Sequence, residues 1–246
     1  MSIWGKVIGG VAGFAVGGPL GAILGTAAGH AYDKMKADDG IRVDQTAARQ
    51  VAFTTAIIVL SAKMAKVDGR VNRAEVDAFK QLFHIAPEEM KNVARLFDEA
   101  KKDAQGFEPY AEQISMMFAH EPAVMEELLG GLFHIAKADG SVHPNEIKFL
   151  RKTALIFGFT ERQFDRLKTI HLGAESSEGD PYQVLGISRK IPDAEVKKVY
   201  RKLIRENHPD TLIAKGMPQE FIDVANEKMA AINAAYDRIE KERGLR

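Results

Sequence analysis

Apolar residues recur three and four positions apart through most of the chain between residues 41 and 172. This spacing places apolar side chains on one face of a helix, where they can pack into a core. Neither the alternating pattern of a β-strand nor an Asn-Gly hairpin turn interrupts it. The pattern therefore predicts an all-α fold, with a bundle of seven helices joined by short turns in this region.

The composition narrows the class of protein. The chain has 246 residues, and 34 lysines and arginines balance 34 aspartates and glutamates, so net charge gives no indication of nucleic-acid binding. The absence of cysteine excludes disulfides, thiolate metal sites and a cysteine nucleophile, and it fits a reducing compartment. The sequence shows no Ser-His-Asp order, Walker loop or closed metal triad. We therefore expect a protein that is not an enzyme, requires no cofactor and binds no nucleic acid.

An uncharged segment at residues 7–29 precedes the helical region and is long enough to cross the hydrocarbon core of a bilayer. Its glycines recur at every fourth position, an arrangement that lines one ridge of a helix and lets two membrane helices approach closely. These glycines, called here the glycine ridge, are Gly9, Gly13, Gly17, Gly21, Gly25 and Gly29. We expect residues 1–40 to form a membrane anchor with a single transmembrane helix that makes the protein a homodimer or a higher oligomer.

Other interpretations of the segment stay open. Pro19 would interrupt a straight helix, so the segment could be kinked or re-entrant rather than fully spanning. A soluble glycine-rich leader, or a cleaved signal peptide with Lys6 before its apolar part, would also fit. More lysines and arginines follow the segment than precede it, however, which predicts that the bulk of the chain faces the cytoplasm.

A short motif occurs twice in the helical region. The segment Ala65–Phe79, "AKVDGRVNRAEVDAF", returns at Ala136–Leu150 as "AKADGSVHPNEIKFL". In each copy a glycine suits the left-handed position that ends a helix, and a glutamate then falls where it can complete a capping box. For the second copy we expect Gly140 in the left-handed position that ends one helix, Pro144 as the first residue of the next helix, and Glu146 as the capping glutamate.

The repeated carboxylates could also bind a divalent cation. Asp-Gly followed by glutamate resembles the second half of an EF-hand loop, but lysine stands at a required ligand position in both copies, which excludes a complete EF-hand. A looser site stays open if the repeat brings four carboxylates together. These are Asp68, Glu75, Asp139 and Glu146.

The end of the chain has a separate helical pattern. Residues 173–179 are mostly small and polar, which predicts a linker, and residues 180–246 follow as a further domain. We expect a short helix in "DPYQVLG", a second helix that begins at Asp193, and, after a loop, a third helix with an apolar stripe. The sequence His-Pro-Asp (HPD) ends the second helix, because proline disfavours the helical conformation of His208, the residue before it.

The second helix of this domain carries a row of basic side chains beside its apolar face. The row consists of Lys197, Lys198, Arg201, Lys202 and Arg205. Taken alone, it would be a solvated face or a nucleic-acid patch. Next to the HPD turn, we interpret it as a docking face for an acidic partner.

These motifs resemble known families. Two antiparallel helices around an exposed HPD turn, preceded by the "DPYQVLG" helix, resemble the J-domain of DnaJ co-chaperones over residues 180–239. The paired Asp-Gly turns within residues 41–172 resemble the TerB domain of tellurite-resistance proteins. With its glycine-rich leader, the whole chain is similar to the membrane-anchored DnaJ-like proteins that carry a TerB-like domain.

The resemblance implies a co-chaperone that binds a DnaK-type chaperone and stimulates its ATPase at the bacterial inner membrane. His208, Pro209 and Asp210 would form the contact, with Asp210 paired to an arginine of the chaperone. The TerB-like region would be a sensing or partner-binding module. The alternative is a membrane scaffold or stress sensor, in which that region binds a cation or a protein and chaperone recruitment is secondary.

Overall fold

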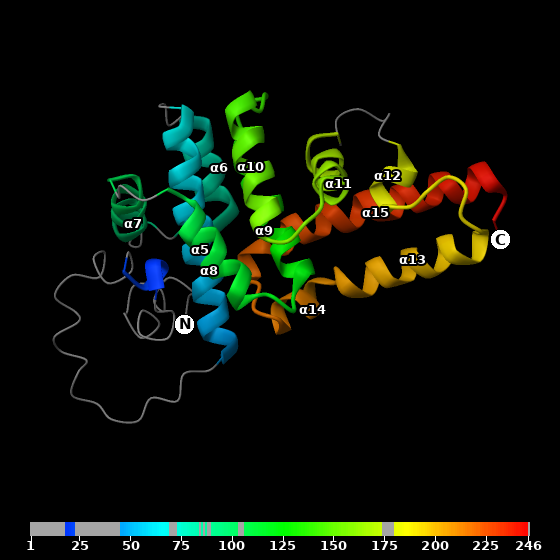
Figure 1. Ribbon diagram of the computed structural model, residues 1–246, viewed down its shortest axis with the longest axis horizontal. Coiled ribbons are helices and arrows are strands. Elements are labelled where there is room, and N and C mark those ends of the chain that lie inside the picture. The colour runs from blue at the N-terminus through cyan, green and yellow to red at the C-terminus, as the bar shows by residue number, and fades with distance from the viewer. Residues whose placement is uncertain are drawn as a thin grey trace.

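The structure of this protein is a computed structural model, in which the chain is helical (Figure 1). The residues that it describes are 18–22, 45–68, 73–83, 85, 87, 90–102, 106–173 and 180–245. No strand occurs within these residues, and the all-α class is confirmed. Of the glycine ridge, only Gly21 lies among them.

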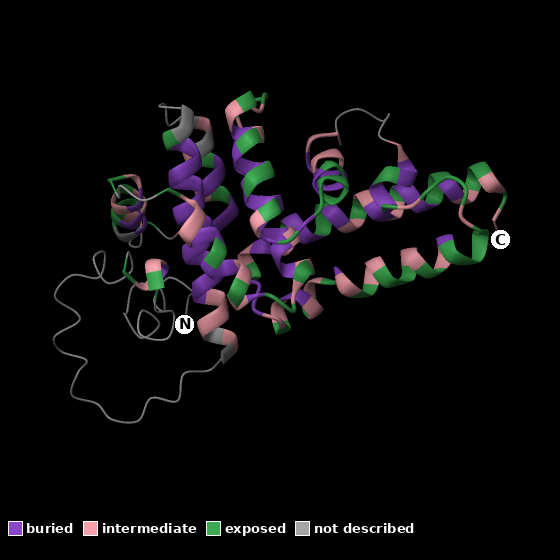
Figure 2. Ribbon diagram, viewed as in Figure 1, coloured by how far each residue is buried: buried purple, intermediate pink, exposed green. Residues whose placement is uncertain are grey.

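Seven helices of the described chain form the predicted bundle, which is named here the bundle and covers residues 45–172. They are α5 (Gln45–Asp68), α6 (Arg73–Phe83), α7 (Met90–Lys102), α8 (Glu108–Met117), α9 (Pro122–Ala136), α10 (Pro144–Ile156) and α11 (Glu161–Leu172). Helix α5 is apolar around most of its circumference and contacts α7, α8, α9 and α10. Figure 2 shows it buried along most of its length, as expected of a helix with no polar face.

The second copy of the repeated turn has the predicted geometry. Gly140 has a φ of +90°, and Pro144 is the first residue of α10. The Nδ1 atom of His143 accepts a hydrogen bond from the Asn145 N–H at 3.3 Å, and the Glu146 carboxylate accepts one from the His143 N–H at 2.9 Å. A capping box therefore joins the turn to α10. The corresponding turn of the first copy lies outside the described residues.

Five elements follow the bundle and make up the terminal domain, residues 180–245. They are α12 (Pro181–Leu185), α13 (Asp193–Glu206), α14 (Pro209–Ala214), the 3₁₀ helix η1 (Gln219–Phe221) and α15 (Ile222–Arg243). Helix α13 ends before His208, as predicted, but the segment after the HPD turn contains α14 where a loop was expected. Pro209 is the first residue of α14, where its missing N–H costs nothing.

Helix α15 takes part in two hydrophobic cores. Its first turns and the residue before them place Phe221, Val224 and Ala225 in the core of the bundle. Farther along, Ile232 and Tyr236 pack in a second core with residues of α12 and α13. Figure 1 shows α15 running from the bundle outward beside α13. The terminal domain is thus packed directly against the bundle.

The expected membrane segment is described only at residues 18–22, which form one helical turn. Leu20 is buried against the bundle, and its backbone N–H donates to Oε1 of Gln113 on α8 at 2.9 Å. Within the described part of the chain, no helix combines the length and apolar character needed to cross a bilayer. The rest of residues 7–29 lies outside the described residues, so the spanning helix stays a prediction.

Candidate docking surface around the HPD turn

The HPD turn is presented at the surface with its backbone held by its own histidine. His208 is extended, with a ψ of 131°, and caps α14 by accepting the Asp210 N–H on Nδ1 at 3.2 Å. The side chain of His208 is 50% exposed and that of Asp210 is 89% exposed. Within 4 Å, His208 is the only basic neighbour of the Asp210 carboxylate among the described residues, at 3.8 Å. The carboxylate is therefore available to a cation of a binding partner.

Asn207, the residue before the turn, closes the end of α13. It is buried, and its side-chain amide and backbone N–H both donate to the carbonyl oxygen of Leu203, at 2.8 and 3.0 Å. These two bonds satisfy a carbonyl that has no partner within the helix. This role of Asn207 was not predicted, although asparagine directly after an apolar helical pattern is a recognised stop signal.

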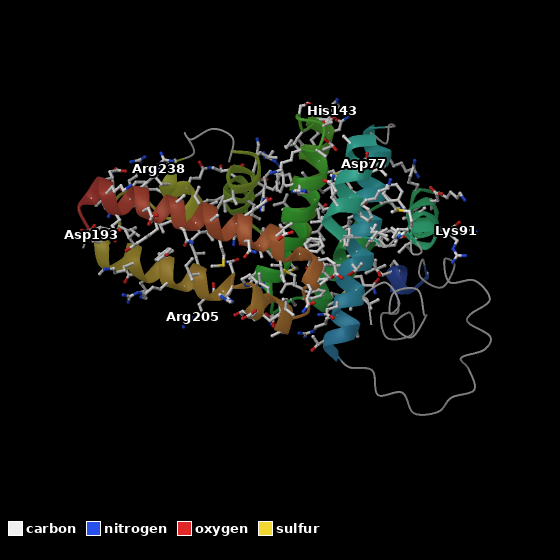
Figure 3. All side chains as sticks on the ribbon, turned by 180° about the vertical axis from the view of Figure 1, so that it is seen from behind. Asp77, Lys91, His143, Asp193, Arg205 and Arg238 are labelled. Atoms are coloured by element: carbon white, nitrogen blue, oxygen red, sulfur yellow. The ribbon has the colours of Figure 1, made fainter. Side chains whose placement is uncertain are left out.

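The basic row of α13 faces solvent. Four of its five members are exposed, and Lys197 is half-buried. Arg201 and Arg205, the latter labelled in Figure 3, have no carboxylate within 4 Å in the described chain. Lys198 and Lys202 make only exposed intrahelical pairs, with Glu195 at 3.3 Å and Glu206 at 3.9 Å. Because such pairs contribute little, the row retains most of its positive charge for an acidic partner.

The opposite face of α13 is fixed against α15, which forces the basic row outward. Val196 is fully buried there. The rings of Tyr200 and Tyr236 stack with centroids 3.9 Å apart and an interplanar angle of 12°. The Tyr200 hydroxyl donates to Oδ1 of Asn233 on α15 at 3.1 Å. The HPD turn and the basic row thus form one continuous surface on a rigid helix pair.

The other end of the helix pair is held by Arg243, near the end of α15. Its guanidinium donates to the Tyr182 hydroxyl of α12 and to Oδ1 of Asp193, both at 2.9 Å. Helix α12 is in turn capped by Asp180, which accepts the Tyr182 N–H at 3.1 Å, and ends at Gly186 with a φ of +70°. The α12 motif was predicted from the sequence, but the role of Arg243 was not, because this residue lies beyond the apolar stripe of α15.

The start of α15 packs against aromatic residues of the bundle. The ring of Phe221 lies 4.7 Å from that of Phe53 and 5.3 Å from that of Phe83, both edge-on. Gly131 of α9 lies beneath it, where a Cβ atom would come within 2.5 Å of the Phe221 ring. Glycine in the middle of a helix costs about 0.5–1 kcal/mol relative to alanine. Here it permits a close contact between the bundle and the terminal domain.

A buried ionic cluster lies beside this aromatic contact. Lys228 of α15 has a fully buried side chain, and its Nζ lies 2.6 Å from Glu126 and 2.9 Å from Glu127, both on α9. Arg166 of α11 pairs with Glu126 at 3.2 Å and also donates to the Val184 carbonyl of α12 at 2.8 Å. The cluster therefore connects two bundle helices to two helices of the terminal domain.

The two glutamates of this cluster differ in their titration. Burial alone would raise the pKa of Glu126, but Lys228 and Arg166 outweigh burial and lower that pKa. For Glu127, burial outweighs the attraction of Lys228 and raises the pKa. Glu126 is thus the member of the pair that is most firmly ionised.

The cation hypothesis stays a prediction. Asp139 accepts the Ser141 N–H at 3.2 Å, and Glu146 is engaged in the capping box of α10. The side chains of Asp68 and Glu75 lie outside the described residues. Among the side chains that the structure does describe, no three acidic or histidine residues lie close enough together to hold a metal ion.

We expect Glu146→Ala to lower the free energy of unfolding by about 0.5–2 kcal/mol, because it removes a cap. Melting curves with and without calcium would measure the change, with the exposed Glu112→Ala as control. A capping role predicts the same loss in both conditions. If calcium raises the melting temperature of the unchanged chain but not that of Glu146→Ala, the glutamate is a cation ligand instead.

Comparison with known proteins gives a family match for each part of the chain. Residues 1–50 match the model of the co-chaperone DjlA transmembrane domain, residues 54–169 that of the tellurite resistance protein TerB, and residues 180–243 that of the DnaJ domain. The family resemblances drawn from the sequence are confirmed, and the terminal domain is a J-domain.

Curated relatives match over the full length. The chain is 31% identical to the co-chaperone protein DjlA of Photobacterium profundum, over 99% of this chain and all of the relative. It is 34% identical to that of Shewanella oneidensis over the whole of both chains, and 29% identical to that of Coxiella burnetii over 98% of each. No solved structure matches the chain.

Proposed function

Because the chain belongs to the DjlA family of J-domain co-chaperones, we propose that it stimulates ATP hydrolysis by a DnaK-type chaperone at the bacterial inner membrane. The observation that supports this proposal most strongly is the HPD turn, where the Asp210 carboxylate is 89% exposed beside the basic row of α13. The protein acts as a regulator, and the chaperone carries out the hydrolysis.

Each part of the surface has a distinct task in docking. The basic row attracts an acidic surface of the chaperone over a distance of about 10 Å at 0.1 M salt, and so raises the rate of encounter. Asp210 then forms a charge-assisted hydrogen bond with an arginine. His208 accepts the Asp210 N–H on Nδ1, which leaves its Nε2–H to donate to the partner.

The direct test is single-turnover ATP hydrolysis by a DnaK-type chaperone, with and without the full chain in detergent or in nanodiscs. We expect severalfold stimulation that saturates with the concentration of the chain. The stimulation at subsaturating concentration should fall as salt is raised, because screening weakens attraction between exposed charges. Hydrolysis that stays at the basal rate at every concentration of the chain would reject the proposal.

The membrane part of the proposal is supported by the uncharged segment 7–29 and by the match of residues 1–50 to the DjlA transmembrane domain. We propose a single-pass helix with the bulk of the chain in the cytoplasm, since lysine and arginine are more frequent after the segment than before it. Extraction of membranes with alkaline carbonate tests this anchor. An integral protein stays in the pellet, and release of the chain would contradict the proposal.

We further propose that the glycine ridge makes the protein a homodimer. Replacing Gly17 and Gly21 with leucine should block close helix approach but preserve insertion, since leucine is more apolar. Cross-linking in membranes should then show severalfold less dimer. The matched control is Ala15→Leu with Ala27→Leu, which places two leucines on the opposite side of the expected helix. Equal dimer yields for both double variants would contradict the ridge.

A further inference from the structure

An apolar cavity of about 140 Å³ lies inside the bundle, between α5, α6, α7 and α9. Its apolar wall includes Ala65, Val76, Phe79, Val93, Phe97 and Ile135. The more exposed residues of its lining are Lys80, Ala94 and Asp98, on α6 and α7. The cavity is therefore deep and apolar on the α5 side and reaches polar surface between α6 and α7.

One buried hydroxyl on the cavity wall has no partner among the residues that the structure describes. Ser61 of α5 is 3% exposed and lines the cavity, and its Oγ atom makes no hydrogen bond to any of these residues. Other hydroxyls of the same helix are satisfied, since those of Thr54 and Thr55 donate to carbonyls one turn earlier, at 2.9 and 2.8 Å. Leaving a buried hydroxyl unpaired is costly and is uncommon in native proteins. This exception on α5 points to a polar atom that occupies the cavity.

The size and chemistry of the cavity indicate which kind of molecule would carry this polar atom. Apolar cavities near 150 Å³ stay dry and hold a molecule such as benzene. An isolated water molecule would need two to four polar partners, whereas Ser61 is the only buried polar side chain among the described residues that line the cavity. We propose that the cavity binds a small amphiphilic molecule, the size of one aromatic ring, whose single hydroxyl or carbonyl group pairs with the Ser61 hydroxyl.

The site lies close to the contact between the bundle and the J-domain. Phe79 forms part of the cavity wall, and its ring lies 4.7 Å from that of Phe83. Phe83 in turn lies 5.3 Å from Phe221, the residue that anchors α15 in the bundle. A ligand against Phe79 is thus two ring contacts away from the J-domain. The proposed binding of a small molecule at this site is independent of the proposed stimulation of a chaperone, so either proposal can fail without the other.

The test uses phenol as the probe and toluene as its matched control, because toluene has the same shape without the hydroxyl. Both are titrated into the full chain in detergent while the melting temperature is recorded. We expect a saturable rise with phenol, by mass action, and a smaller rise with toluene. No saturable rise with either probe would overturn the proposal.

Two variants locate the site. Ser61→Ala removes the hydroxyl with little change in volume, and it should reduce the phenol response to the level of toluene. Ala65→Leu fills the cavity and should abolish both responses, with circular dichroism to verify that helix content is retained. A phenol response that is unchanged in Ser61→Ala would overturn the pairing with the hydroxyl. A response that persists in folded Ala65→Leu would place the probe elsewhere and overturn the site.

Discussion

Replacing Lys228 with methionine is expected to lower the free energy of unfolding by about 3–5 kcal/mol, because it leaves the buried carboxylate of Glu127 without its cation. Lys228 is fully buried and lies within 2.9 Å of both Glu126 and Glu127. Methionine has a similar length, so the variant changes charge more than packing. Equilibrium denaturation of the full chain by urea would measure the difference. The control is Lys241→Met, an exposed lysine on the same helix, for which little change is expected.

A second variant separates charge from volume. Combining Lys228→Met with Glu127→Leu removes both members of a buried pair, which is often neutral for stability, whereas Arg166 remains to balance Glu126. The double variant should therefore be more stable than Lys228→Met alone. A double variant that loses the sum of the effects of Lys228→Met and Glu127→Leu would show that the pair is not coupled. If Lys228→Met alone loses no more stability than Lys241→Met, the buried cluster itself is contradicted.

The absence of cysteine offers an independent measurement of the same contact. Glu121 of the bundle pairs with Lys215, in the segment after α14, at 2.9 Å. Cysteines at these two positions should be joined efficiently by a short bismaleimide in the otherwise unchanged chain. Adding Lys228→Met should lower the yield, because the J-domain then separates more often from the bundle. An unchanged yield would mean that the cluster stabilises the fold without holding the two domains together.

The helices of this protein were predictable from sequence because local signals specify them. Apolar spacing predicted the seven bundle helices, and the repeated turn predicted the capping role of Glu146. The packing of the J-domain on the bundle was not predicted. A periodic stripe identifies the apolar face of α15 but not its partner, and here Phe221 and Ile232 of one stripe enter two different cores. The burial of Lys228 was not predicted either, because lysine is almost never fully buried unless it is paired, and its partners on α9 are distant in sequence.

One local signal could have indicated this contact. Gly130 and Gly131 are adjacent within helix α9, and paired glycines inside a helix indicate that something packs closely there. In the structure, a Cβ atom at Gly130 would lie 3.2 Å from Val224 of α15, and one at Gly131 would lie 2.5 Å from Phe221. The HPD turn and the exposed basic row were easier to predict, because a turn and a four-residue charge spacing are both local patterns.

Replacing Asp210 with asparagine is expected to raise the concentration of the chain that gives half-maximal stimulation of the chaperone ATPase by about 30-fold or more. Truncating one partner of a hydrogen-bonded charge pair at an interface costs about 2–5 kcal/mol, and 2 kcal/mol corresponds to that factor. The fold should survive, because the Asp210 side chain is 89% exposed and asparagine has the same shape. The only local loss is a favourable charge in the first turn of α14, worth at most about 1 kcal/mol.

The measurement is single-turnover hydrolysis at several concentrations of the full chain, with circular dichroism on the same samples. Asp223→Asn is the matched control, since it removes an exposed carboxylate of α15, a helix that carries neither the HPD turn nor the basic row, and should leave stimulation unchanged. His208→Gln should resemble Asp210→Asn, because it removes both the ring that accepts the Asp210 N–H and the donor offered to the chaperone. Full stimulation by folded Asp210→Asn would show that the chaperone is engaged elsewhere, whereas equal losses in Asp210→Asn and Asp223→Asn would indicate a general effect of charge rather than a contact at the HPD turn.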